Sequence, residues 1–525
     1  MLRRAPAPLL ALVALLAAVV VAGCGSSAAS GGPDLTAAVP RDALVYVEAT
    51  LRPQGGARDG ALAAAGKVLH TDDPSGRIRE LLQQAFAQAD PPVDYAKDID
   101  PWLGDRVGLW VGVPASASAD PSVGAIVAVR DSELARTKIE ALEAKDGKKP
   151  VKRSVDGNDY EVFSGDDIAV AFRDDELLLG QEAAVRRMLT LPGDGGLDGS
   201  DTYRNATADL DANRLATYFL DTNRFLDLAA KSDPQAAQQI GPLRSLIGAD
   251  AVKPVAGSFS ANDTRMSVES VAPAGGGVLQ KLGGLTGSGA AAPLLKELPA
   301  SSWAAFAVPE AGKTLQAVFQ QLAGALGGAA VTGQLRQQLG LDLQQDVFSW
   351  MGDVGVFARG TSVSAVDGGL VIKITDEARA ATAFGKFVGL ARTRGGLNSR
   401  PVDVSGADAA FDLGLPNEPK PVVLARGKGR MVLAYGTDAA AQALQPDQPL
   451  EQGDSYAQAK TALGDGLEPS LLVSMPAIVS LVDSSGSADA SWQKAKLYLD
   501  ALGMIATGTK KEGDKLRSRF VVGFK

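Results

Sequence analysis

The segment DIDPWLGDRVGLWVG, residues 98–112, decides how the fold of this chain is understood. A tryptophan between aspartates leads into a Gly-Asp pair and then into an alternating apolar run. Such alternation is typical of a strand with one buried face, and a tryptophan buries enough area to anchor the corner before it. Taken alone, the segment also has the residue types of an acidic site beside an aromatic platform.

A second copy of this segment lies in the other half of the chain. The run DVFSWMGDVGVF, residues 346–357, aligns with it when one residue is omitted after the Gly-Asp pair. Five further pairs of segments recur in the same order, at an offset that drifts only between about 245 and 259 residues. The residues shared by both copies of the motif, for which we expect a structural role, are Trp102, Gly104, Asp105, Trp350, Gly352 and Asp353.

The repeat predicts an α+β fold built as a tandem duplication, with two pseudo-symmetric halves. Short runs of period two joined by turn residues indicate antiparallel hairpins, and helical patterns lie between them. Each half is therefore expected to be an antiparallel sheet with helices over one face. The predicted first repeat covers residues 35–273, a Gly-rich linker covers 274–292, and the second repeat covers 293–525.

The first residues have the organisation of an export signal. Two arginines precede an apolar run, which fits the charged and apolar regions of a signal peptide over residues 1–23. The ending VAGC resembles the lipobox of bacterial lipoproteins, a resemblance that implies acylation of Cys24, with residues 24–34 as a flexible tether. We expect anchoring by acyl chains to the outer face of the cytoplasmic membrane, in the cell envelope. The alternative is a membrane-spanning anchor with an incidental cysteine.

The composition excludes several classes of function. The formal net charge is −9, and the chain has no dense block of basic residues. It is therefore expected to bind nucleic acid poorly, because it would repel the phosphates. One histidine and one cysteine leave no disulfide within the chain and no His/Cys metal site. The histidine, His70, stands beside two aspartates in a loop-like segment without a counterpart in the second half. No cofactor is expected.

Two sets of acidic residues are candidates for chemistry. Asp105 and Asp353 would form a carboxylate pair for acid–base work if the two halves brought them together. The alternative is a turn that leads into each strand, and the repetition favours it because a fold determinant must persist in both halves. The weak candidates for calcium, in a Gly/Asp loop without the closing glutamate of a full calcium loop, are Asp194, Asp198 and Asp201.

The Ala/Leu/Gly-rich segment 315–340 predicts a helix that is apolar over most of its length. One interpretation is a buried helical hairpin with close backbone contact through Gly327 and Gly328. The other is a helix that lines an apolar cavity or touches lipid.

Two motifs resemble an uncharacterised bacterial family, domain of unknown function 3352. They are VPRDALVYVE (39–48) and DIDPWLGDRVG (98–108). The family has no established activity, so the resemblance implies no catalytic residue. We expect a lipid-anchored, non-enzymatic envelope protein that binds an unknown protein or an apolar ligand. The alternatives are an extracytoplasmic hydrolase that uses carboxylates, and a structural surface protein without a ligand.

Overall fold

The computed structural model describes residues 34–89, 92–113, 121–145, 150–163, 168–232, 253–273, 293–325, 333, 336–337, 340–393, 395–486 and 489–525. They divide into two compact units, unit 1 within residues 34–272 and unit 2 within residues 273–525. The predicted signal peptide, Cys24, the linker 274–292 and the Gly327-Gly328 pair lie outside the described residues. No helix of the described ranges is long and apolar enough to span a membrane.

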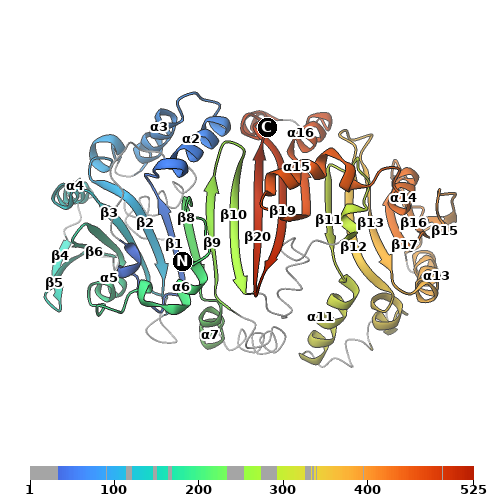
Figure 1. The fold of residues 1–525 in the computed structure, drawn as a ribbon, viewed down its shortest axis with the longest axis horizontal. Coiled ribbons are helices and arrows are strands. Elements are labelled where there is room, and N and C mark those ends of the chain that lie inside the picture. The colour runs from blue at the N-terminus through green and yellow to red at the C-terminus, as the bar shows by residue number, and fades with distance from the viewer. Residues whose placement is uncertain are drawn as a thin grey trace. The chain divides into compact units, whose positions relative to one another are not determined.

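Unit 1 is an antiparallel sheet with helices packed against it (Figure 1). Its helical elements are η1 (Leu35–Ala38), α2 (Gly55–Leu69), α3 (Pro74–Ala87), η2 (Tyr95–Ile99), α4 (Ser132–Lys145), α5 (Glu182–Leu189), η3 (Leu197–Gly199), α6 (Asp201–Thr207) and α7 (Thr222–Ser232). Its strands are β1 (Val45–Thr50), β2 (Leu103–Val111), β3 (Val123–Val129), β4 (Pro150–Val155), β5 (Asn158–Phe163), β6 (Ile168–Arg173), β7 (Glu176–Gln181), β8 (Ala216–Leu220), β9 (Val255–Ala261) and β10 (Arg265–Pro273). The strand order within the unit is β4-β5-β6-β7-β3-β2-β1-β8-β9-β10.

Unit 2 is built in the same way. Its helical elements are α10 (Pro293–Lys296), α11 (Ala311–Ala325), η5 (Leu343–Phe348), α13 (Glu377–Thr393), α14 (Thr437–Leu444), η6 (Leu450–Gln452), α15 (Asp454–Leu463), α16 (Met475–Ser484) and α17 (Ala490–Leu499). Its strands are β11 (Ala304–Val308), β12 (Met351–Arg359), β13 (Asp367–Ile374), β14 (Arg400–Pro401), β15 (Ala409–Asp412), β16 (Val422–Gly427), β17 (Arg430–Tyr435), β18 (Glu468–Ser474), β19 (Leu502–Glu512) and β20 (Lys515–Phe524). The order β14-β15-β16-β17-β13-β12-β11-β18-β19-β20 matches that of unit 1 strand for strand.

Local sequence explains the hairpins. Asp156 and Gly157 both have positive φ, 49° and 81°, between β4 and β5. Lys428 and Gly429 take the same conformation, 53° and 69°, between β16 and β17. Turns with two left-handed residues match the right-handed twist of paired strands, and glycine adopts that conformation without steric penalty. These turns fix the register in which the strands pair.

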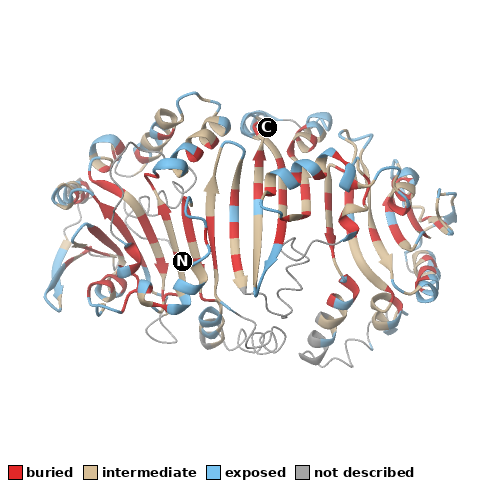
Figure 2. Ribbon diagram, viewed as in Figure 1, coloured by how far each residue is buried: buried red, intermediate tan, exposed pale blue. Residues whose placement is uncertain are grey.

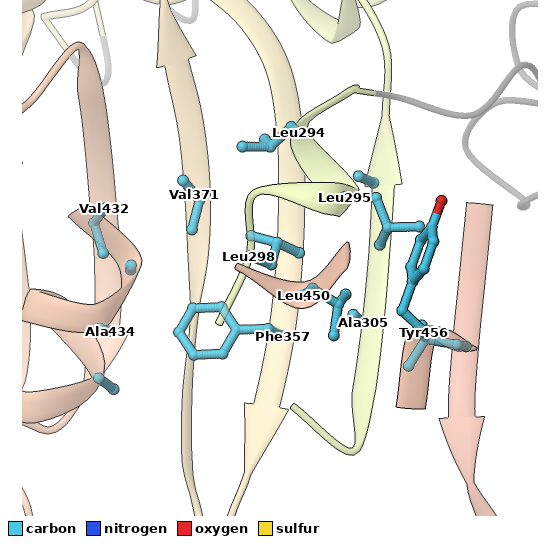
Figure 3. Packing of buried hydrophobic residues seen from close by; sticks show 14 of the residues in the cluster. Leu294, Leu295, Leu298, Ala305, Phe357, Val371, Val432, Ala434, Leu450 and Tyr456 are labelled. Atoms are coloured by element: carbon cyan, nitrogen blue, oxygen red, sulfur yellow. The ribbon is translucent and has the colours of Figure 1, made fainter. Parts of the chain in front are cut away.

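Apolar residues lie on both faces of each sheet. In unit 1, one face carries the cluster of Tyr46, Trp110 and Leu178, and the other carries the cluster of Trp102, Val127 and Leu179. In unit 2, the larger cluster gathers side chains of β11, β12, β13 and β17 against α10 and α15; Figure 3 shows Leu294, Leu298, Phe357, Val371 and Val432 in it. A smaller cluster on the opposite face packs under α13. The α+β prediction is confirmed: each unit combines helices with an antiparallel sheet.

Candidate functional site

The tryptophan of each motif holds a corner at the start of a strand. The buried indole of Trp102 donates through Nε1 to the carbonyl oxygen of Asp98 at 2.6 Å. Trp350 makes the same bond to Asp346 at 2.8 Å. Both tryptophans are fully buried, so each indole fills the space beneath the corner and satisfies its only donor within the preceding turn.

The first aspartate of each motif closes this turn through its side chain. Asp98 accepts the amide of Asp94 at 3.3 Å and pairs with Lys138 of α4 at 3.1 Å. Asp346 accepts the amide of Asp342 at 2.9 Å and pairs with Lys386 of α13 at 2.6 Å. The carboxylates therefore connect a π-helical turn to the helix that follows β3 or β13.

The aspartate of the Gly-Asp pair accepts a backbone amide in both units. The carbonyl oxygen of Asp105 accepts the amide of Leu51 at 2.7 Å. The Oδ1 atom of Asp353 accepts the amide of Glu310 at 2.9 Å. Gly104 lies against the backbone of the neighbouring strand at Ala128. Each motif thus brings its own tryptophan, glycine and aspartate together at one corner, where the observed contacts are those of a turn and a strand entrance.

The acidic loop does not form a metal centre. Asp201 pairs with Arg204 at 2.5 Å, and the same arginine binds the carbonyl oxygen of Asp198 at 2.8 Å. The carbonyl oxygen of Asp194 lies against Gly199. Within the described ranges, no group of three or more histidine, cysteine or acidic side chains is arranged to hold a metal ion. His70 ends α2 in the left-handed conformation, with φ of 51°.

A buried polar pair in unit 1 was not predicted. The Tyr46 hydroxyl donates to Glu48 at 2.6 Å, and Arg106 approaches the same carboxylate at 3.6 Å. Burial raises the pKa of Glu48, although the Tyr46 hydrogen bond acts in the opposite direction. Burial also raises the pKa of Tyr46. The signal was present in the sequence: in LVYVEA, strand alternation places the glutamate on the same face as the inward-pointing tyrosine.

An apolar row with exposed members lies on the β11–β17 face of unit 2 that is opposite its larger core, beside the smaller cluster under α13. We define the open face as Phe306, Val356, Leu370 and Leu433. These residues are direct cross-strand partners on β11, β12, β13 and β17, so they form one row across the sheet. Val356 is 46% exposed and Leu433 is 40% exposed. One face of an antiparallel sheet is commonly polar where it meets water, and here it is apolar.

The part of the corresponding row of unit 1 that lies on β7 and β3 is buried. Leu179 on β7 pairs with Ala125 on β3, as Leu433 pairs with Leu370 in unit 2. Leu179 is only 1% exposed and belongs to a cluster that includes side chains of α3 and α4. Figure 2 shows the difference along the strands: β3 is almost entirely buried, whereas β13 is mostly half-buried.

The described residues define an antiparallel α+β protein with an apolar row of which Val356 and Leu433 are exposed. The chain belongs to the family described as "Protein of unknown function (DUF3352)", whose match covers residues 5–485. The predicted resemblance is therefore confirmed, and the family brings no activity with it. No curated protein matches the chain.

Three solved structures of one protein, TP0453, show a weak likeness to this chain. Crystal form IV is 10% identical, with a TM-score of 0.25, over 50% of this chain and 87% of that one. Crystal form III is 8% identical, with a TM-score of 0.21, over 47% and 80% of the two chains. Crystal form I is 10% identical, with a TM-score of 0.23, over the same shares. Similarity at this level does not establish a shared fold.

Proposed function

We propose that this protein is a lipid-anchored envelope protein that binds an apolar, chain-like ligand on the open face of unit 2 and catalyses no reaction. The observation that carries the proposal is the row of Phe306, Val356, Leu370 and Leu433, which leaves large apolar side chains in contact with water. Water contact with this surface is unfavourable by roughly 25 cal/mol per Å². Binding of a ligand that covers this surface is driven mainly by the removal of its apolar area from water.

The chemistry around the row favours a hydrocarbon chain over a protein partner. The half-buried flanking residues on the same face are also uncharged: Val354 on one side, and Ala304, Ala358 and Gly368 on the other. Protein interfaces usually combine an apolar centre with a polar rim. The row crosses four strands, a span of about 14 Å at the usual strand spacing, which suits an extended acyl chain.

The proposed anchor places the protein beside a source of such chains. The apolar run before Cys24, the VAGC ending and the polar residues after it support export and acylation. Stable attachment takes two membrane signals, such as dual acylation. Replacement of Cys24 by alanine is therefore expected to move the protein from the membrane fraction to the soluble extracytoplasmic fraction. Retention in the membrane fraction would contradict the anchor.

We further infer that the two units descend from one by tandem duplication. The matching strand order supports this origin. So does the repeated corner, in which Trp102 and Trp350 bond the carbonyl oxygens of Asp98 and Asp346. Divergence after duplication produces two sheets of the same topology with different surfaces. The equivalent residues Leu179 and Leu433 are 1% and 40% exposed.

Binding to the open face is tested with cis-parinaric acid, a fluorescent fatty acid, and delipidated protein. The wild-type chain is expected to bind it saturably. Val356→Lys places a charge in the row and should weaken binding at least tenfold. The matched control is Val363→Lys in the loop after β12, where valine is 55% exposed and lies outside the row. Absence of uptake by the wild-type chain, or equal binding by both variants, would refute the proposal.

A further inference from the structure

Unit 1 contains a hollow on the side of its sheet that faces α4. It lies beside α4, over the end of the sheet formed by β4, β5 and β6, and has a volume of about 350 Å³. Its lining includes Arg136, Lys152, Asp159, Glu161, Val170 and Phe172. This volume is at the lower end of the range of small-molecule sites, roughly 300–1,000 Å³.

The equivalent strands of the two units carry different residues beside the hollow. On β5, Glu161 pairs across the sheet with Val170 of β6. On β15 of unit 2, the residue that pairs with Leu424 of β16 is Phe411. The phenyl ring of Phe411 packs against Phe384 of α13, at 6.1 Å between ring centroids, and closes the space under that helix. A glutamate at the same place in unit 1 leaves the space open and polar.

The cations of the hollow are not equally available. Arg153 is held by both carboxylate oxygens of Glu182, at 2.7 and 2.6 Å. Lys152 pairs loosely with Glu161 at 3.8 Å. Arg136 instead lies over the ring of Phe172, with 4.5 Å from its Cζ to the ring centroid. It makes no hydrogen bond or ion pair to any residue that the structure describes.

One carboxylate of the lining also lacks a partner among the described residues. The side chain of Asp159, at the start of β5, has no hydrogen bond or ion pair within the described part of the chain. The groups without an internal partner are therefore one guanidinium and one carboxylate. Apolar side chains of Val170 and Phe172 complete the wall. A complementary ligand carries one charge of each sign and an apolar part.

We propose that this hollow binds a small zwitterion with an apolar side chain, a free amino acid or a close analogue. The ligand carboxylate pairs with the guanidinium of Arg136, whose planar donors match a carboxylate in a bidentate manner. The ligand ammonium is bound by the carboxylate of Asp159. The ligand side chain contacts Val170 and Phe172. This site is in unit 1 and is independent of the open face of unit 2.

The test is isothermal titration calorimetry of the full chain with three probes that share a phenyl ring. L-phenylalanine carries both charges, phenylacetate carries only the carboxylate, and 2-phenylethylamine carries only the ammonium. We expect one site for L-phenylalanine and at least tenfold weaker binding of each single-charge probe. No heat with any probe at millimolar concentration, or equal affinity for phenylacetate and L-phenylalanine, would overturn the proposal.

Variants distinguish loss of specific contacts in the hollow from a general effect of removing a charge. Arg136→Gln is expected to weaken L-phenylalanine binding at least tenfold. Asp159→Asn, in an exposed hairpin, should do the same without affecting the packing under α4. The control is Arg77→Gln on α3, which removes an exposed arginine whose partner is Glu80, at 2.9 Å. Unchanged affinity in both Arg136→Gln and Asp159→Asn, or an equal loss in the Arg77→Gln control, would refute the assignment.

Discussion

Replacing the motif glycine by alanine is expected to have different effects in the two units. A Cβ atom at residue 104 would lie 2.5 Å from the carbonyl oxygen of Ala128 and 2.6 Å from its carbonyl carbon. At residue 352, the carbonyl oxygen of Lys373 and Cγ2 of Thr375 would both be 3.1 Å away. The first contact requires a shift of backbone. The second is relieved by a few tenths of an ångström.

The magnitudes follow from these contacts. Overpacking of a close-packed site destabilises by about 1–3 kcal/mol, whereas restriction of the unfolded chain by alanine stabilises by about 0.4–1 kcal/mol. We therefore expect Gly104→Ala to lower the free energy of unfolding of unit 1 by about 2 kcal/mol. Gly352→Ala should leave unit 2 within about 1 kcal/mol of the wild type, because the two effects nearly cancel.

Differential scanning calorimetry of the two variants measures this difference. A loss of about 2 kcal/mol corresponds to a fall of roughly 4–8 °C in the Tm of a unit of this size. Gly104→Ala should show that fall and Gly352→Ala should not. Equal shifts in the two variants, or the larger shift for Gly352→Ala, would refute the argument that close backbone contact requires glycine in unit 1.

Three further predictions concern charged residues. Burial raises the pKa of Glu48, so this group makes the folded state less stable as pH rises above about 4.5. Glu48→Gln should remove that decline in the free energy of unfolding, measured by urea unfolding. A difference between wild type and variant that does not change with pH would contradict this. The pKa of Glu468 is lowered to about 2, chiefly by the Tyr456 hydroxyl. The stabilisation of the folded state by ionised Glu468 is therefore complete above about pH 4.5 and is lost toward pH 2. By the same assay, Glu468→Gln should be less stable than the wild type at pH 6 and similar to it at pH 2. Lys386→Met leaves the buried carboxylate of Asp346 without its cation. This should lower the free energy of unfolding by about 1.5–3 kcal/mol. A loss below 0.5 kcal/mol, as is usual for an exposed ion pair, would count against a stabilising role of this bond.

The corners of the fold are predictable from the sequence because local residues specify them. The alternation after Gly104 places Val107 and Leu109 on one face of β2, as observed. The tryptophan four residues after an aspartate returns its indole to that residue's carbonyl oxygen, so the contact is made within one turn of chain. Short-range features of this kind require no knowledge of which strands pair.

The hollow and the open face were not predictable in the same way. Glu161 and Phe411 become equivalent only when the register of β5 with β6 is compared with that of β15 with β16. The exposure of Leu433 depends on which helices cover the sheet, and that coverage is a tertiary property. The segment 315–340 predicts an apolar ligand, whereas the residues of the proposed binding row lie on strands β11, β12, β13 and β17.

Comparison of the two units separates positions that hold the fold from positions free to serve a function. Tyr46 and Glu48 are opposite Trp110 and Gly108 in unit 1. The corresponding residues of unit 2 are alanines, opposite Phe357 and Gly355. A sheet of the same topology therefore forms without the buried tyrosine–glutamate pair. The corner bonds of Asp98 and Asp346, by contrast, are present in both sheets. If the two units arose by the proposed duplication, the shared corner residues serve folding, and residues for binding are expected at positions where unit 1 and unit 2 differ.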